Sequence, residues 1–294
     1  LLAVVAVAIL GVFIVYSVRA AEFDLSRVTR PVGGGMLYDA SNEPVAALDS
    51  NVAAPVTYGE LPQTLVDAFL TREDEHFFEH NGVVYSSILR SMLRNMSSMR
   101  YEQGASTISM QLTRNVFDLQ GKTLDRKLLE VFLTRRIERA FDKKTILTQY
   151  LNRIYFGQSC YGIGSAARYY FGKKVQDLDL VECATLAGLV RGPSIFNPVA
   201  SMKEAVKVRN ETLARMLKVG LISQEEYDSA TNAPIVLKSA AQRETVENSY
   251  PTMWTRMELD ALRGELGDAV DGASVVSTLC MPVQLQLEDS VERA

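Results

Sequence analysis

The sequence has few of the residues that mark several common classes of protein. Its 294 residues include three cysteines, at an odd count and without CxxC spacing, which predict neither a disulfide framework nor a zinc site built from cysteines. A basic excess is also missing, because 35 acidic side chains outnumber 31 basic ones and the net charge is -4. This balance argues against a general nucleic-acid-binding protein. No tandem repeat or low-complexity stretch occurs, so the chain is expected to be globular.

The first 18 residues have no charged or amide side chain. The run LLAVVAVAILGVFIVYSV ends at Arg19, and a helix of about 20 apolar residues crosses a bilayer core of about 30 Å. A buried core helix would carry a polar stripe, which is missing here. A cleaved signal peptide is the alternative, but its apolar region is usually shorter. We therefore predict a transmembrane anchor over residues 1–18, truncated at its start because neither Met nor a basic flank precedes it.

The rest of the chain divides by its patterning. Residues 19–59 are predicted to be a connector, broken by prolines and glycines, with short strands in MLYDA and PVAAL. Within residues 60–233 apolar residues recur at helical spacing, for example in LPQTLVDAFLTRED and DRKLLEVFLTRRIERAF. The predicted fold class is therefore mainly α. Residues 234–294 are predicted to be a linker followed by a strand, a proline break and the start of a helix.

Acids and histidines are concentrated in residues 73–80, which hold both histidines of the chain. Phenylalanines beside a carboxylate desolvate it and raise its pKa, as a general base working near neutral pH requires. A solvated helix end with Phe anchors explains the same composition. A third interpretation is a zinc protease. In the pattern His76-x-x-Glu79-His80, histidines at i and i+4 lie on one helix face and a glutamate serves as base.

Two further clusters carry polar groups on predicted helices. Ser106 and Thr107 predict an N-capped helix start that exposes backbone N–H groups to an anion, with Gln111 and Arg114 as added donors. Ordinary capping explains this cluster equally well.

The other cluster is Lys122, Arg126 and Glu130, which are spaced by four and share one helix face. They form either a salt-bridge ladder or a diphosphate clamp. The apolar residues of the same helix are expected to face the core: Leu124, Leu128, Val131 and Phe132.

Taken in order, the motifs resemble those of the family 51 glycosyltransferases, the peptidoglycan polymerases. The resemblance covers roughly residues 60–233 and five motifs: EDEHFFEHNG (73–82), GASTISMQLTRN (104–115), RKLLE (126–130), ILTQYLNRIYFG (146–157) and ATLAGLVRGPSIFNP (184–198). It implies a lysozyme-like helical lobe with a small membrane-facing jaw. It also implies polymerisation of lipid II into β-1,4 glycan strands by inverting displacement of polyprenyl diphosphate.

The resemblance also assigns roles to residues. Glu73 matches the general base, which takes the proton of the acceptor's 4-hydroxyl. Glu130 matches a second essential glutamate that assists departure of the diphosphate, directly or through a divalent cation (Mg²⁺ or Mn²⁺) that the sequence does not require. The family's polar and phosphate-binding positions correspond to Ser106, Gln111, Arg114, Lys122 and Arg126. Two departures, Val84 and Met110, affect fine positioning rather than the type of reaction.

The expected surroundings follow from the same resemblance. The partners are lipid II, the growing glycan strand, the membrane and other cell-wall synthesis proteins. The expected location is the cytoplasmic membrane, spanned once, with the catalytic domain on the outer (periplasmic) side. Residues 86–101 match a mobile, membrane-dipping stretch of the family, although an amphipathic core helix explains their pattern as well.

The C-terminal stretch GASVVSTLCMPVQLQLEDSVERA looks like the segment that precedes the transpeptidase domain in class A penicillin-binding proteins. The ordered transpeptidase signatures SxxK, SxN and KTG are absent from the sequence. We therefore expect a bifunctional parent that is cut before its transpeptidase domain. A catalytically inactive cell-wall scaffold and the zinc protease using His76 and His80 remain as alternatives.

Overall fold

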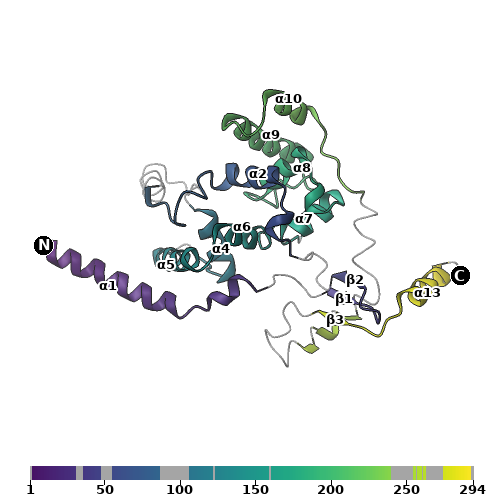
Figure 1. Cartoon of the computed structure of the whole chain (residues 1–294), viewed down its shortest axis with the longest axis horizontal. Helices are drawn as coiled ribbons and strands as arrows, with labels where there is room; N and C mark the ends of the chain where they lie inside the picture. The colour runs from purple at the N-terminus through teal and green to yellow at the C-terminus, as the bar shows by residue number, and fades with distance from the viewer. Residues whose placement is uncertain are drawn as a thin grey trace.

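The structure, a computed structural model, describes residues 2–30, 36–47, 55–86, 106–121, 123–158, 160–239, 254–255, 257–259, 261–262 and 274–292. A helical body lies between a long N-terminal helix and a small sheet, and the two termini lie at opposite ends of the molecule (Figure 1). The helices of the body are α2 (Gln63–Glu73), α4 (Ile108–Val116), α5 (Leu124–Ala140), α6 (Lys143–Leu151), α7 (Ile163–Phe171), α8 (Leu180–Leu189), α9 (Met202–Lys218) and α10 (Gln224–Asn232). Short 3-10 turns are η1 (Leu25–Val28), η2 (Tyr58–Glu60) and η3 (Val175–Asp177). The mainly α fold class is confirmed.

Side chains at the helix starts explain why the helices begin where they do. In α4, α5, α6, α8, α9 and α10 the N-cap side chain accepts a backbone N–H of the first turn. The caps are Thr107, Thr123, Asp142, Asp179, Ser201 and Ser223. Each such cap contributes about 0.5 to 2 kcal/mol. The predicted start at Ser106-Thr107 is therefore confirmed, with Thr107 as the cap.

The helix α8 lies at the centre of the body. Every residue from Glu182 to Leu189 is buried, and α8 packs against both α2 and α9. Gly188 permits the close approach to α9, because a Cβ there would lie 3.0 Å from a methyl group of Val208. The core continues through α4 and α6, so the helices that carry the clustered polar residues rest on one hydrophobic core.

The predicted inner face of α5 is wrong at Leu124 and Leu128, whereas Phe132 packs against the core as expected. Leu124 is 71% exposed and Leu128 is 37% exposed, while the core is formed by Leu129, Leu133 and Ile137. The inner face of α5 also holds Glu130 and Thr134. Polar residues that pair in the interior therefore occupy part of the buried face, which a rule that places apolar residues inside does not predict.

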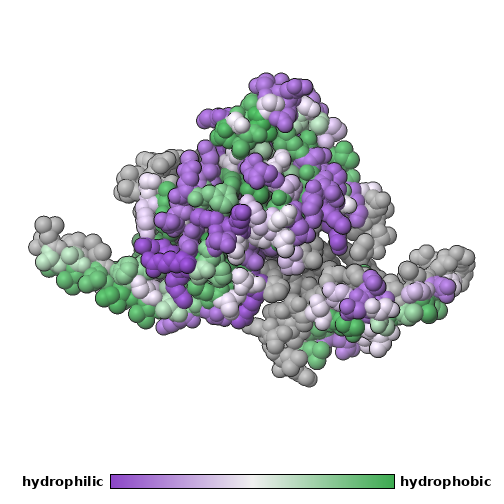
Figure 2. Space-filling view, viewed as in Figure 1, coloured by the Kyte–Doolittle hydropathy of each residue, from purple (hydrophilic) through white to green (hydrophobic). Residues whose placement is uncertain are grey.

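The N-terminal helix α1 (Leu2–Ala21) projects away from the body (Figure 1), and much of its described surface is hydrophobic (Figure 2). Its last turns pack on α5, where Phe13 and Tyr16 contact the Phe132 ring at centroid distances of 5.4 and 5.8 Å. Arg19 pairs with Asp125 at 2.5 Å. Within the described part of the chain, no helix is both long and apolar enough to cross a membrane. The predicted transmembrane anchor is therefore not confirmed.

A three-stranded sheet joins the connector to the C-terminal segment. The strands β1 (Met36–Tyr38) and β2 (Pro44–Ala47) pair antiparallel, and β3 (Val275–Val276) adds parallel to β1. The helix α13 (Met281–Glu292) follows. The strands expected in the connector and the strand and helix expected near the C-terminus are thus all observed. The stretch expected to dip into the membrane falls almost entirely outside the described residues.

The two leucines of α5 allow a matched stability test. Leu133→Ala should lower the free energy of unfolding by about 2 to 5 kcal/mol, because Leu133 is fully buried and its truncation leaves a cavity. Leu124→Ala, the same change at a site 71% exposed, should shift it by less than about 0.5 kcal/mol. Urea unfolding followed by circular dichroism measures both. Equal losses would contradict the observed orientation of α5.

Candidate active site

Glu73 is the last residue of α2, and its carboxylate is held by two donors. Gln111 Nε2 donates to Oε2 at 3.1 Å, and Arg191 Nε donates to Oε1 at 2.9 Å. The carboxylate is largely buried, with 9% of the side chain exposed. An ionised carboxylate offers about four lone-pair sites, so each oxygen keeps room to accept a proton.

The amide of Gln111 is itself oriented by a buried phenol. Tyr150, from α6, donates its hydroxyl to Gln111 Oε1 at 3.3 Å, which directs the NH₂ group of Gln111 toward Glu73. Burial raises the pKa of Tyr150 well above its usual value, and the negative charge of Glu73 adds to the rise. Tyr150 therefore remains a neutral donor throughout the physiological range of pH.

The segment after Glu73 is not a helix. The helix α2 ends at Glu73, and residues 75–79 form turns, so His76 and His80 do not share a helix face. His76 pairs with Glu79 at 3.0 Å on the surface, while His80 binds Asp74. No group of three or more potential ligands suited to a metal ion occurs among the described residues. The premise of the zinc-protease interpretation is therefore wrong.

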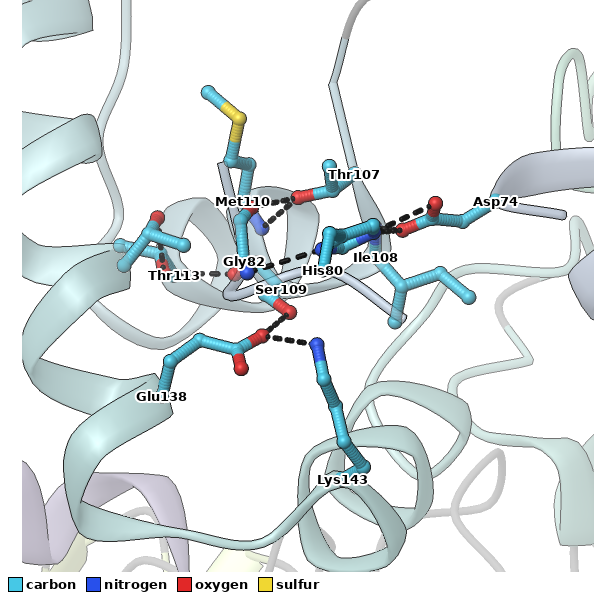
Figure 3. Close-up of polar contacts among 11 residues, drawn as sticks. Asp74, His80, Gly82, Thr107, Ile108, Ser109, Met110, Thr113, Glu138 and Lys143 are labelled. Carbon is cyan, nitrogen blue, oxygen red and sulfur yellow. Dashed lines mark hydrogen bonds and ion pairs between the residues drawn. The ribbon is translucent and has the colours of Figure 1, made fainter. Parts of the chain in front are cut away.

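His80 holds this segment in one conformation (Figure 3). The backbone N–H of Gly82 donates to His80 Nδ1 at 3.0 Å, and Nε2 lies 2.9 Å from Asp74 Oδ1. Because Nδ1 accepts a hydrogen bond, the proton of a neutral ring is on Nε2, which then donates to Asp74. Asp74 also accepts the N–H of Ile108 at 3.0 Å, at the start of α4, where a helix favours a negative charge.

A second buried carboxylate, Glu138 on α5, lies next to this segment. Glu138 accepts hydrogen bonds from Ser109 and, at 2.8 Å, from Lys143 Nζ (Figure 3). The Lys143 ammonium also lies 4.4 Å from the ring centroid of the buried Phe77. Phe77 thus acts as an anchor in the core.

Glu130 lies on the buried face of α5 and is fully inaccessible to solvent. Arg126 pairs with its Oε2, and Lys127 Nζ lies 2.8 Å from its Oε1. Lys127 also donates to Ser106 Oγ at 3.1 Å. Burial lowers the pKa of Lys127, although the charge of Glu130 acts in the opposite direction. Two cations around one buried carboxylate leave a net positive charge at this point.

The helix α4 links the surroundings of the two carboxylates. Gln111, on α4, contacts Glu73, while Ser106, just before α4, contacts Lys127 and through it Glu130. The hydroxyls of Thr113 on α4 and Thr134 on α5 lie 2.9 Å apart and fix the spacing of the two helices.

Most of the predicted residues therefore belong to this one site: Glu73, Ser106, Gln111, Arg126 and Glu130. Arg114, half-buried on α4, lies close enough that its charge helps to lower the pKa of Lys127. Lys122 falls outside the described residues.

Three residues of the site were not predicted as site residues. They are Lys127, Tyr150 and Arg191. All three lie inside motifs that the sequence displays, RKLLE, ILTQYLNRIYFG and ATLAGLVRGPSIFNP. Selecting positions by i,i+4 spacing excluded Lys127, which is one residue from Arg126.

The surroundings of Glu130 do not fit a divalent cation. Both of its oxygens already face positive side chains, Arg126 and Lys127, and a third positive charge would be repelled. A metal there would also need further oxygen ligands, and no other carboxylate contacts Arg126 or Lys127 among the described ion pairs.

Comparisons with known proteins agree with the motifs. A family model for transglycosylases matches residues 41–217. The chain belongs to the transglycosylase family. It is 43% identical over 216 residues to a Cupriavidus necator protein provisionally named a transglycosylase, covering 70% of this chain and 93% of that protein. The predicted membership of a glycosyltransferase family that includes penicillin-binding proteins is thereby confirmed.

Longer transglycosylase relatives extend beyond this chain. Penicillin-binding protein 1A of Escherichia coli is 40% identical over 255 residues, covering 87% of this chain and 30% of that protein. Penicillin-binding protein 1A of Aquifex aeolicus is 38% identical over 220 residues, covering 75% of this chain and 29% of that protein. This chain thus spans about 30% of the length of these relatives. A crystal structure of penicillin-binding protein 1A from Haemophilus influenzae aligns with 85% of this chain and 28% of its own, at 27% identity and a TM-score of 0.45.

Two glycines test the packing behind Glu73. Gly82 and Gly121 both have positive φ, 82° and 89°, so alanine is strained at either position. A Cβ on Gly82 would lie 2.4 Å from Cγ of Glu138, whereas nothing lies within 4 Å of one on Gly121. Gly82→Ala should therefore lower the free energy of unfolding by about 1 to 3 kcal/mol more than Gly121→Ala, measured by urea unfolding. Equal losses of unfolding free energy would show that the Glu138 side chain moves away from the new methyl group without cost.

Proposed function

We propose that this transglycosylase polymerises lipid II into glycan strands of the bacterial cell wall. The observation that carries the proposal is that α4 connects two carboxylates in different environments. Glu73 keeps room to accept a proton, and Glu130 is surrounded by cations. An acid–base reaction that releases an anionic leaving group requires these two environments side by side.

Glu73 is proposed as the general base. It would take the proton of the acceptor sugar's 4-hydroxyl as that oxygen attacks the anomeric carbon of the growing strand. The new C1–O4 bond forms as the bond from C1 to the diphosphate breaks, and the configuration at C1 inverts. Gln111 and Arg191 orient the carboxylate, which supports a base that is already positioned before substrate binds.

The positive side chains around Glu130 are proposed to bind the departing diphosphate. Arg126 and Arg114 would stabilise the negative charge that develops on the leaving group, and Lys122 is proposed to join them. The Nε atom of Arg126 is buried and has no hydrogen-bond partner among the described residues, so this guanidinium retains a donor. Ser106 would add a neutral donor. Glu130 keeps Arg126 and Lys127 fixed in the free enzyme.

We also propose that the protein works on the outer side of the cytoplasmic membrane, held by residues 1–18 as a single-pass anchor. The support is the exposed apolar surface of α1, where Val4 and Val7 are 71% and 70% exposed. A lysozyme-like lobe would then face the periplasm, with a small jaw next to the bilayer. Lipid II and its product are both membrane-bound, so an anchored enzyme would meet them there.

Replacing the proposed base tests the activity directly. The protein should form glycan polymer from purified lipid II in detergent, and Glu73→Gln should reduce kcat by about 100-fold or more, because an amide cannot accept the proton. Gel electrophoresis of labelled product measures both. Glu79→Gln, in the same segment but paired with His76 on the surface, should retain activity. Equal rates for wild type and Glu73→Gln would reject Glu73 as the base, and a lipid II complex without any polymer would favour the scaffold.

Lysine substitutions on α1 test the membrane proposal. Changing Val4 and Val7 together to lysine should reduce the fraction that floats with phosphatidylethanolamine–phosphatidylglycerol vesicles, because each lysine at bilayer depth costs about 2.5 to 3.5 kcal/mol. Val236→Lys, at a site that is also 70% exposed, is the control and should not change flotation. Unchanged flotation of a chain without residues 1–18 would contradict the proposal.

A further inference from the structure

Arg191 makes two contacts at the end of α2. From just beyond the end of α8, its Nε donates to Glu73 Oε1 at 2.9 Å and an NH₂ group donates to the backbone carbonyl of Arg72 at 2.5 Å. One guanidinium thus spans a side chain and the main chain of neighbouring residues, which fixes the carboxylate relative to its own helix. The planar fork of arginine suits this double contact, whereas an ammonium has no such geometry.

The position of Glu73 on α2 explains why a cation is needed there. The C-terminal end of a helix carries unpaired carbonyls and a partial negative charge, so it disfavours a carboxylate and favours a cation. Glu73 is the last residue of α2. Arg191 satisfies one of the terminal carbonyls and counters the charge of Glu73 at the same time.

Arg191 also lies close to a second arginine at the same helix end. Arg72, buried in the same helix end, has its pKa lowered by burial and by the positive charge of Arg191, and Glu211 compensates from α9 at 3.2 Å. Arg191 therefore repels Arg72, which is already paired, and about a third of its side chain is exposed. Its removal would relieve this repulsion but would leave the largely buried Glu73 carboxylate without its cation, so its loss should affect both the orientation of Glu73 and the stability of the fold.

We propose that Arg191 is a positioning residue for Glu73, holding the carboxylate at the end of α2 in the orientation that receives the acceptor's proton. This inference depends on the proposed function, in which Glu73 is the base. Because Arg191 acts through Glu73, its loss should reduce kcat and leave the KM for lipid II nearly unchanged.

The experiment compares Arg191→Ala, Arg191→Lys and wild type in lipid II polymerisation. Arg191→Ala should lower kcat by roughly 10- to 100-fold, because a misplaced base loses its alignment, and should change KM by less than about twofold. Methylguanidinium chloride should restore part of the kcat of Arg191→Ala. The kcat of Arg191→Lys should lie between those of Arg191→Ala and wild type. The control is Arg30→Ala, which removes an exposed ion pair with Asp24 and should change neither parameter.

Several outcomes would overturn the inference. An unchanged kcat would show that Glu73 needs no such contact. A raised KM with kcat unchanged would make Arg191 a substrate-binding residue instead. Absence of rescue, together with a large fall in Tm of both variants, would make its role structural.

A crystal structure of Arg191→Ala separates this inference from the proposed function. The inference predicts that the Glu73 carboxylate leaves its contact with Gln111, and an unmoved carboxylate would reject it. If wild-type protein forms no polymer, the proposed function fails, and the position of Glu73 in this variant still decides whether Arg191 orients it.

Discussion

The contact between the Asp74 carboxylate and the backbone N–H of Ile108, at 3.0 Å, is the interaction on which the arrangement of the site depends. It joins the residue after Glu73 to the first turn of α4, where a negative charge is favoured. The position of α4 in turn fixes Gln111 on one side and Ser106 on the other. A single carboxylate at a helix start thereby ties the end of α2 to the helix that carries Gln111.

The described interior of this fold holds several charged side chains that pair with a partner of opposite sign. Glu130 is surrounded by Arg126 and Lys127, Arg72 pairs with Glu211, and Glu138 pairs with Lys143. Removing one partner of such a pair leaves a buried charge, which is more destabilising than removing both. The site is thus part of a charged interior, so its catalytic and structural contacts share the same residues.

The sequence predicted the helices best where their apolar periodicity was long, as in α2 and α5, and it proposed Glu73, Gln111, Arg126 and Glu130 as site residues. It did not predict α7 or α10. In α10 the only residue given as buried is Ala230, whereas the buried residues of α7 recur at helical spacing and their pattern was missed. It also placed Leu124 inside, because periodicity alone does not reveal which of two faces is buried when polar residues pair in the core. The contact between Arg191 and Glu73 was not predictable either, since it joins positions 118 residues apart.

The parallel pairing of β1 with β3 constrains the order of folding. Leu37 and Tyr38 pair with Val275 and Val276, so the last strand of the sheet comes from a segment that follows all the helices of the body. During synthesis β1 remains with one open edge until that segment leaves the ribosome, and open strand edges invite pairing with other chains. The helical body, whose contacts are more local, is therefore free to form first. Until β3 pairs with β1, a nascent chain therefore keeps an open strand edge that favours aggregation.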